Sequence, residues 1–302
     1  MTNLILALDW TPNINHIGFF VAHTKGFYKD QELNLRIIDP SEDNYAITPA
    51  KKLELGAADF ALCPTESILS YRTKEIPFPM ISIAAILQKD LSAIAVMAES
   101  NIQSPKSLDG KSYASYKARY EDQIVKQMIK NDGGNGNIHV VYPDKLGIWD
   151  TLTKQKFDST WIFTNWEGVE AEQNGIDLRL FKMEDYTIPY SYSPMLVANE
   201  TMLDSKKEAY TNFLAATKKG FLYTIEKPVE AAEILKRFLS EKDKDINVVK
   251  AIERSAHSFG ELKTWGKMDE KVITAFLDWI YEHKLEDQQI SVSEMMTNAL
   301  NS

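Results

Sequence analysis

The alternation of short apolar strands with helices, and the place where it restarts, constrains the fold more than any other feature. Between residues 4 and 90, apolar runs such as Leu33–Ile38 and Phe60–Cys63 alternate with helical patterns. The alternation starts again at Ala93–Met97, and the apolar run Met195–Ala198 follows this second set. Strands that are separated by helices form mostly parallel sheets with helices on both faces. The sequence therefore predicts an α/β protein with two such sheets.

This order also predicts how the chain is divided. Lobe I would contain residues 1–91 and 192–302, including the C-terminal helices, and lobe II would contain residues 92–191. A chain of 302 residues is too long for one typical core and suits two lobes of roughly 100–200 residues each. Open α/β sheets bind ligands where strand ends and helix N-termini meet, so we expect a ligand cleft between the lobes.

Charge and cysteine content argue against several classes of partner. The chain has 43 acidic and 34 basic residues, a formal net charge of −9, and no basic run as dense as nucleic-acid binding needs. No apolar run approaches the roughly 20 residues that span a bilayer. The single cysteine, Cys63, belongs to no Cys/His set at zinc spacing. We therefore expect no nucleic-acid partner, no membrane insertion and no metal.

The N-terminus shows no targeting signal. The residues before the strand at Leu4 are Met1, Thr2 and Asn3, with no basic region and no apolar stretch of roughly 7–15 residues. We therefore expect a cytoplasmic protein. A chain from which a signal had been removed would begin in the same way and would be periplasmic.

Residues 9–16 follow the first strand and precede the first helix, so they lie at the carboxyl edge of the sheet. Trp10 offers a ring face for stacking, Asn13 or Asn15 can cap the helix, and His16 can donate a hydrogen bond to a ligand. Trp10, Asn13 and His16 are candidate ligand-binding residues. The alternative is that Trp10 packs against the helix, the asparagine only caps, and His16 is bonded locally.

Two later segments combine aromatic rings with polar groups. After a strand, Trp166 and Glu167 offer a stacking face and a carboxylate, which can accept from the amino group of an aminopyrimidine as carboxylates do from cytosine. Residues 185–194 contain three tyrosines and two prolines, and there Tyr190 and Tyr192 can stack and form hydrogen bonds. All four are candidate ligand-binding residues. Core packing of Trp166, helix capping by Glu167 and a packed hinge loop remain open alternatives.

Two helix starts complete the candidates. Thr65 and Glu66 follow the third strand, where helix N–H groups favour an anion or a carbonyl group. Tyr116 precedes a helix of lobe II, beside Lys117 and Arg119, which can clamp a phosphate or a carboxylate. Exposed cations are more often only solvated, and this segment has no glycine-rich phosphate loop, so phosphate is not implied.

These motifs resemble the family of thiamine-pyrimidine-precursor proteins. The resemblance covers most of residues 4–200 and rests on residues 8–13 with His16 and Gly18, Lys25–Tyr28, Ser107–Lys111 and Asn165–Gly168. This family contains bacterial periplasmic proteins that bind formylaminopyrimidine and fungal hydroxymethylpyrimidine-phosphate synthases. The resemblance implies a periplasmic-binding-protein-like (type II) fold, and in the binding proteins the tyrosine loop lines the pyrimidine pocket.

The resemblance leaves a binding protein and an enzyme as alternatives. The fungal synthases carry a cysteine cluster in the loop that corresponds to residues 190–194, and they use pyridoxal phosphate and iron. This chain has tyrosine, serine and proline there and no cysteine. Because thiolates suit redox iron, their absence favours a non-catalytic protein without a cofactor, which binds a thiamine-precursor pyrimidine or a similar planar ring. A pyrimidine-forming enzyme that uses His16 is the alternative.

Lobe closure is the predicted binding mechanism. A ring would enter between Trp10 and the loop of Tyr190, and closure would bring Trp166 and Glu167 over it, with the crossing strands as the hinge. A sulfonate-type binder is a weaker alternative, because a small anion needs hydrogen-bond donors rather than ring faces. The sequence names no partner permease.

Overall fold

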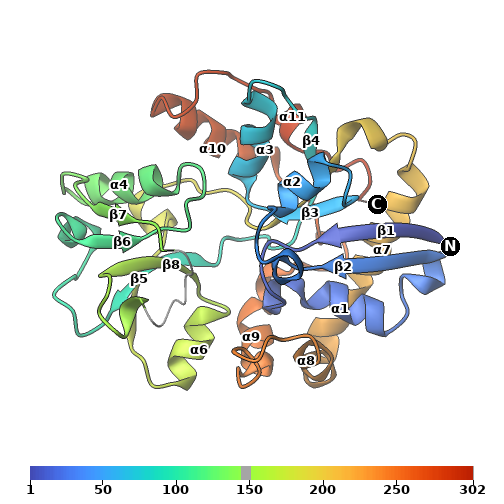
Figure 1. Cartoon of the computed structure of the whole chain (residues 1–302), viewed down its shortest axis with the longest axis horizontal. Coiled ribbons are helices and arrows are strands. Elements are labelled where there is room, and N and C mark those ends of the chain that lie inside the picture. The colour runs from blue at the N-terminus through green and yellow to red at the C-terminus, as the bar shows by residue number, and fades with distance from the viewer. Residues whose placement is uncertain (144–150, 302) are drawn as a thin grey trace. The chain divides into compact units, whose positions relative to one another are not determined.

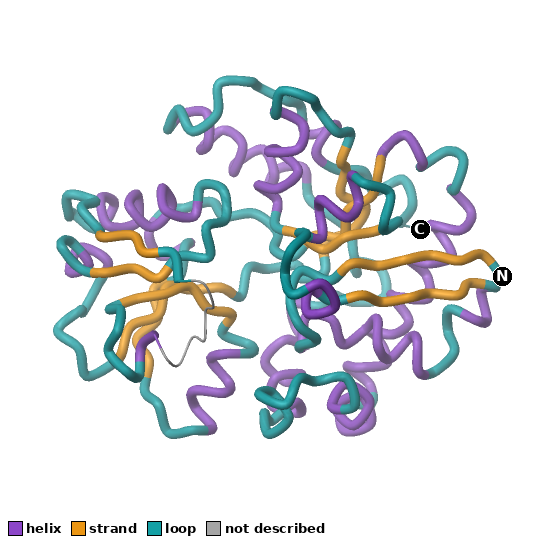
Figure 2. Tube along the Cα trace, in the orientation of Figure 1, coloured by secondary structure: helices purple, strands orange, loops and turns teal. Residues whose placement is uncertain are grey.

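The computed structural model describes residues 1–143 and 151–301 (Figures 1 and 2). The chain divides into two compact units. Unit 1 contains Met1–Asp90, Ser191–Thr274 and Gln288–Ser302, and unit 2 contains Leu91–Tyr190 and Ala275–Asp287. The cleft expected between two lobes stays a prediction.

Unit 1 is built on a sheet whose described strands lie in the order β2-β1-β3-β10-β4. Strand β1 pairs in parallel with β2 and β3, whereas β10 runs antiparallel to its neighbours β3 and β4. The antiparallel member, β10, is the strand that follows the return of the chain from unit 2. The bounds are β1 Thr2–Ala7, β2 Leu33–Ile38, β3 Phe60–Cys63, β4 Met80–Ala85 and β10 Met195–Asn199.

Unit 2 repeats this topology with its described strands in the order β7-β6-β8-β5-β9. Strand β6 pairs in parallel with β7 and β8, and β5 runs antiparallel to β8 and β9. Here too the antiparallel strand is the first one after the chain enters the unit. The mostly parallel sheets that the sequence predicts are therefore confirmed. The bounds are β5 Ser92–Met97, β6 Ser112–Ala114, β7 His139–Val141, β8 Ser159–Phe163 and β9 Leu178–Phe181.

Helices flank both sheets, and they form most of the chain after β10 (Figure 1). The helices of unit 1 are α1 Ile17–Thr24, α2 Pro49–Glu54, α3 Thr65–Thr73, α7 Lys207–Glu226, α8 Pro228–Lys236, α9 Val248–Ser255 and α11 Val292–Met295. Unit 2 has α4 Glu121–Asn131 and α6 Glu167–Gln173. Helix α10, Glu270–Glu282, begins in unit 1, and its later part belongs to unit 2.

The core of unit 1 forms between its sheet and the pair α1 and α7. Strand β3 is buried along its whole length, as expected for an inner strand covered on both faces. The edge strand β4 is also buried along its whole length, and isolated bridges join its Ser82 to Met296 and its Ala85 to Gly266. The two helices approach closely at two glycines: a Cβ on Gly220 would lie 2.0 Å from the carbonyl oxygen of Gly18. The stacked rings of Phe60 and Phe213, with centroids 4.2 Å apart, join the sheet to α7. This packing holds α1 and α7 together and α7 against the sheet.

One helix begins later than the sequence indicates. The pattern of residues 46–54 predicts a helix over Ala46–Glu54, but the helix begins only at Pro49, because Thr48 is extended and its hydroxyl accepts the N–H of Lys51 as an N-cap. The sequence also predicts a helix over Ile148–Gln155, and the start of that predicted helix falls in residues 144–150, which lie outside the described residues.

The last helices depart from the predicted division. The sequence predicts that all of residues 192–302 belong to lobe I, whereas Ala275–Asp287 pack with unit 2. Glu286 pairs with the guanidinium of Arg119 and accepts from the Tyr120 hydroxyl at 3.0 Å. These partners are far apart in sequence, so no local pattern indicates the contact.

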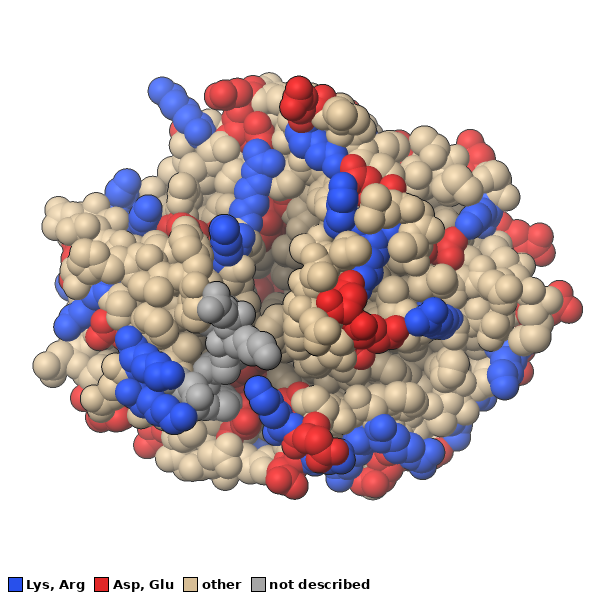
Figure 3. Space-filling view, viewed as in Figure 1, with Lys and Arg blue, Asp and Glu red and all other residues tan. Residues whose placement is uncertain are grey.

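Charged side chains of both signs are interspersed over the face drawn in Figure 3. Such mixing is typical of a solvated surface and agrees with the spread of charge along the sequence. Among the described helices, none is both long enough and apolar enough to cross a membrane.

Candidate functional site

The carboxyl edge of β1 and β3 gathers the candidate residues of unit 1. In the parallel register Ala7 lies opposite Ala61, so the segments that follow the two strands emerge side by side. Burial raises the pKa of the Cys63 thiol, and the nearby carboxylates of Asp9 and Glu66 raise it further. Two carboxylates therefore border this edge of the sheet.

A hydrogen-bond network joins Asp9 to His16 at this edge. His16 Nε2 lies 2.7 Å from Asp9 Oδ1, and the His16 side chain has no exposed surface, whereas the Asp9 side chain is 26 % exposed. The other ring nitrogen, Nδ1, accepts the backbone N–H of Asn13 at 3.2 Å. The Asn13 side chain accepts the N–H of Asn15, which completes a capping box on the short helix Ile14–His16.

This network assigns structural roles to two predicted ligand contacts. Asn13 is the N-cap that the sequence analysis kept as an alternative. His16 uses both ring nitrogens within unit 1, so its ring holds Asp9 rather than presenting an atom to a ligand. Asp9, which directly precedes Trp10 in the motif, is not among the site residues that the sequence predicts.

Trp10 follows Asp9 and is only half-buried. Its ring contacts that of Tyr45, with centroids 5.7 Å apart and planes tilted by 56°. Tyr45 is 48 % exposed and was not predicted as a site residue. The indole is therefore supported from one direction and remains partly accessible, as a stacking surface must be.

Thr65, Glu66 and Tyr192 complete this edge. Thr65 is buried, and its hydroxyl donates to the carbonyl of Tyr192 at 2.8 Å. The Tyr192 hydroxyl accepts the N–H of Asp269 at 2.9 Å, and burial raises the pKa of this tyrosine. Glu66 lies in the first turn of α3 and is 3 % exposed. Thr65 and Tyr192 therefore join β3 to the chain before β10, and Glu66 adds a buried carboxylate.

Unit 2 holds the remaining candidates, and rings dominate one group of them. Tyr190 contacts Trp161 with centroids 5.2 Å apart and Phe276 with centroids 5.5 Å apart, both edge to face. Trp161 and Phe276 were not predicted as site residues, and Phe276 comes from α10. The predicted Trp166 is 4 % exposed, so its packing role, which the sequence left open, is the one that the structure favours.

The second group of unit 2 is acidic. Glu167 accepts the backbone N–H of Phe163 at 2.9 Å, which ties the start of α6 to the end of β8. Burial raises the pKa of Tyr116 well above its usual value, with further contributions from the carboxylates of Glu167 and Glu121. The charges of two carboxylates therefore act on the buried Tyr116 hydroxyl.

Glu121 shapes the loop that bears Tyr116. Its buried carboxylate accepts from the Tyr113 hydroxyl at 2.5 Å and from the N–H groups of Tyr116 and Ala118, both at 3.0 Å. Burial raises the pKa of Glu121, and these hydrogen bonds oppose that shift. The arginine of this loop, Arg119, is engaged by Glu286, so it is not an open phosphate clamp.

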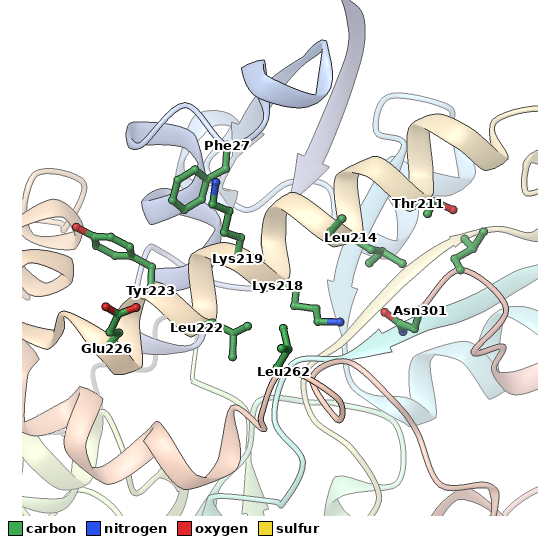
Figure 4. A pocket seen from close by; sticks show the side chains of 12 residues that line it. Phe27, Thr211, Leu214, Lys218, Lys219, Leu222, Tyr223, Glu226, Leu262 and Asn301 are labelled. Atoms are coloured by element: carbon green, nitrogen blue, oxygen red, sulfur yellow. The ribbon is translucent and has the colours of Figure 1, made fainter.

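Two cavities lie elsewhere in unit 1. One, of about 320 Å³, runs along the outer side of α7, and none of the candidate residues lines it (Figure 4). There Lys219 extends over the Phe27 ring, with Nζ 4.0 Å from the centroid, and Lys218 points the other way. The other, of about 380 Å³, includes Pro12 and Asp39 and borders the Trp10 loop. Neither cavity is lined by any of the candidate rings.

Residues 1–143 and 151–301 contain no cluster of side chains that could bind a metal ion. No three side chains of His, Cys, Asp or Glu in that part of the chain are placed to hold a metal ion together. Cys63 is buried within β3, opposite Met195 of β10.

Solved structures define the class of protein. The chain superposes on the nitrate-binding protein NrtA of Synechocystis with a TM-score of 0.75 and 12 % identity, covering 99 % of this chain and 87 % of that one. The alkanesulfonate-binding protein SsuA of Xanthomonas axonopodis gives 0.73 and 11 %, covering 98 % of each chain. The fold is therefore that of the periplasmic binding proteins, as the sequence analysis expected.

Sequence comparison then gives the family. The chain belongs to the NMT1/THI5-like family, whose profile matches residues 13–231. It is 26 % identical to the formylaminopyrimidine-binding protein of Halalkalibacterium halodurans, over 76 % of this chain and 68 % of that protein. It is 24 % identical to the 4-amino-5-hydroxymethyl-2-methylpyrimidine phosphate synthase of Legionella pneumophila, over 78 % and 73 %. The predicted family resemblance is confirmed, and both binding proteins and synthases are among the relatives.

Proposed function

We propose that this protein binds a small planar heteroaromatic molecule of the aminopyrimidine class and performs no chemistry on it. The proposal rests on one observation, which is the pairing of a partly accessible ring, Trp10, with the carboxylate of Asp9 at the carboxyl edge of β1. Open α/β sheets bind their ligands at this edge. Similarity to a formylaminopyrimidine-binding protein supports the same class of ligand.

The Trp10 ring and the Asp9 carboxylate would bind different parts of such a ligand. Stacking of a nucleobase-sized ring on an aromatic side chain stabilises a complex by about 1–3 kcal/mol. A carboxylate accepts hydrogen bonds from ring-edge amines, and such charge-assisted bonds are stronger than neutral ones. The combination therefore favours a flat ring that carries an amine over a small inorganic anion.

The proposal assigns further ligand contacts to Tyr190 and Glu167 of unit 2. Tyr190 is held edge to face by Trp161 and Phe276, which lowers the entropy that its ring would lose on stacking. Glu167 adds a second carboxylate, whose charge contributes to the raised pKa of Tyr116. Substitutions of Trp10 or Asp9 test the contacts proposed in unit 1, and substitutions of Tyr190 or Glu167 test those proposed in unit 2.

An enzyme of the synthase type is the second candidate, because synthases are among the relatives. The loop at residues 190–194 has no cysteine, and Cys63 is buried in a strand with a raised pKa, which disfavours thiolate chemistry. These features support binding without catalysis. A cytoplasmic location stays a proposal on the sequence alone.

Native mass spectrometry distinguishes the two candidates. The protein is incubated with 4-amino-5-hydroxymethyl-2-methylpyrimidine and, in a separate sample, with pyridoxal phosphate. The binding proposal expects a one-to-one adduct of intact pyrimidine and no covalent pyridoxal adduct. A pyridoxal adduct that survives borohydride reduction, with the visible absorbance of a lysine Schiff base, would support the synthase and overturn the proposal.

A further inference from the structure

The hydrogen bonds of His16 fix the position of its proton. The backbone N–H of Asn13 can only donate, so His16 Nδ1 must accept with its lone pair. The single ring proton of the neutral imidazole is then on Nε2, which donates to Asp9 Oδ1. Because the ring has no exposed surface, no solvent molecule replaces either partner. The contact is therefore a directed hydrogen bond onto one chosen oxygen of Asp9.

The second oxygen of Asp9 has a different environment. Among residues 1–143 and 151–301, His16 provides the one hydrogen bond to this carboxylate, and the side chain is 26 % exposed. Oδ2 therefore keeps its full capacity to accept. It lies on the residue before Trp10, so an acceptor and a stacking surface follow each other at the end of β1.

We propose that Asp9 is the residue that selects a ring-edge amine over a ring-edge carbonyl, and that His16 is the positioning residue that aims its carboxylate. This inference rests on the proposed function and names the chemical feature that its ligand must carry. An amine of the ligand donates to Oδ2. A carbonyl at the same ring position would place two acceptors face to face, without water to separate them.

Because the His16 proton is fixed on Nε2, the substitution Asp9→Asn should reverse the hydrogen-bonding preference of the site. The side-chain oxygen of the asparagine must accept from His16 Nε2, because Nδ1 cannot give up the N–H of Asn13 without losing the helix cap. The amide NH₂ is then directed to the ligand, so an acceptor becomes a donor. We expect the preference to invert, with the carbonyl compound binding more tightly than the amine.

The test compares two ligands that differ at one position. Calorimetry gives the affinities of 4-amino-5-hydroxymethyl-2-methylpyrimidine and its 4-oxo analogue for the wild type, Asp9→Asn and the matched control Glu42→Gln. Glu42 is an exposed carboxylate of unit 1 that pairs with Arg36, so its substitution removes the same charge outside the site. A charge-assisted hydrogen bond corresponds to a preference of about 10- to 100-fold for the amine in the wild type and the control.

His16 is tested without any ligand. In ¹⁵N-labelled protein, long-range ¹H–¹⁵N spectra report which ring nitrogen carries the proton, and we expect Nε2. His16→Gln, whose amide NH₂ can still donate to Asp9, should keep part of the preference for the amine. His16→Leu should lose more of it, while its melting temperature, measured in parallel, separates this effect from unfolding.

The outcomes separate this inference from the proposed function. If the wild type binds neither compound, the proposed function is wrong and the selection by Asp9 is wrong with it. If the wild type binds both compounds equally, or Asp9→Asn keeps the preference for the amine, the function stands and the role of Asp9 is overturned. A proton on Nδ1 would overturn the positioning role of His16, even if Asp9→Asn does not fold.

Discussion

Removal of the Trp10 ring is the most informative single perturbation of the proposed site. Trp10 is half-buried and contacts the exposed Tyr45, so truncation to alanine leaves the core of unit 1 intact. We expect Trp10→Ala to weaken binding of 4-amino-5-hydroxymethyl-2-methylpyrimidine by about 1–3 kcal/mol, because a base-sized ring loses its stacking partner. This corresponds to a rise in Kd of roughly 5- to 150-fold.

Calorimetry at one temperature measures this change, and Trp10→Phe serves as the matched variant because it keeps a smaller aromatic face. The expected order of affinity is wild type, then Trp10→Phe, then Trp10→Ala. Circular dichroism and thermal melting establish that each variant is folded. An unchanged Kd for a folded Trp10→Ala protein would refute the role of the indole as a stacking surface.

Two further predictions concern the scaffold. Gly220→Ala should destabilise unit 1 by at least about 1–3 kcal/mol in urea unfolding, since its Cβ would lie 2.0 Å from the Gly18 carbonyl oxygen; equal stability would show that α1 and α7 do not pack closely there. Glu121→Gln tests the buried carboxylate of unit 2, whose pKa burial raises above the usual 4.5, so the folded protein holds this proton more tightly than the unfolded chain does. The stability of the wild type relative to this variant should therefore fall as pH rises above about 4.5 through the raised pKa, and a pH-independent difference would contradict the burial of an ionising group.

The strands were the most predictable part of the fold. Phe60–Cys63 and Leu33–Ile38 match the predicted strands residue for residue. The first is a short continuous apolar run, and the second alternates apolar with polar residues before it ends on two isoleucines, and both patterns are typical of strands. Helix ends were less predictable, as the start of α2 shows, because one N-cap at Thr48 outweighs the apolar pattern before it.

The association of Ala275–Asp287 with unit 2 could not be predicted from local pattern. It depends on contacts such as Tyr190 with Phe276, whose partners are separated by most of the C-terminal helices. Amphipathic periodicity indicates which face of α10 is buried, but it does not say against which unit.

The sequence predicted the site segments better than the roles of their residues. Trp10 and Trp166 are the same residue type after similar strands, yet one is half-buried and the other is 4 % exposed. Asp9 was missed because its importance comes from the bond to His16, which a turn of the short helix brings within 2.7 Å. The signal was present in the motif, since both residues lie within 9–16.

Isothermal titration calorimetry of the wild type with 4-amino-5-hydroxymethyl-2-methylpyrimidine tests the central claim most directly. The proposed function predicts one site per chain and a Kd of about 1 μM or tighter, equivalent to about −8 kcal/mol. Folded protein that gives no binding heat at any of several temperatures, with the pyrimidine raised to about 1 mM, would contradict it.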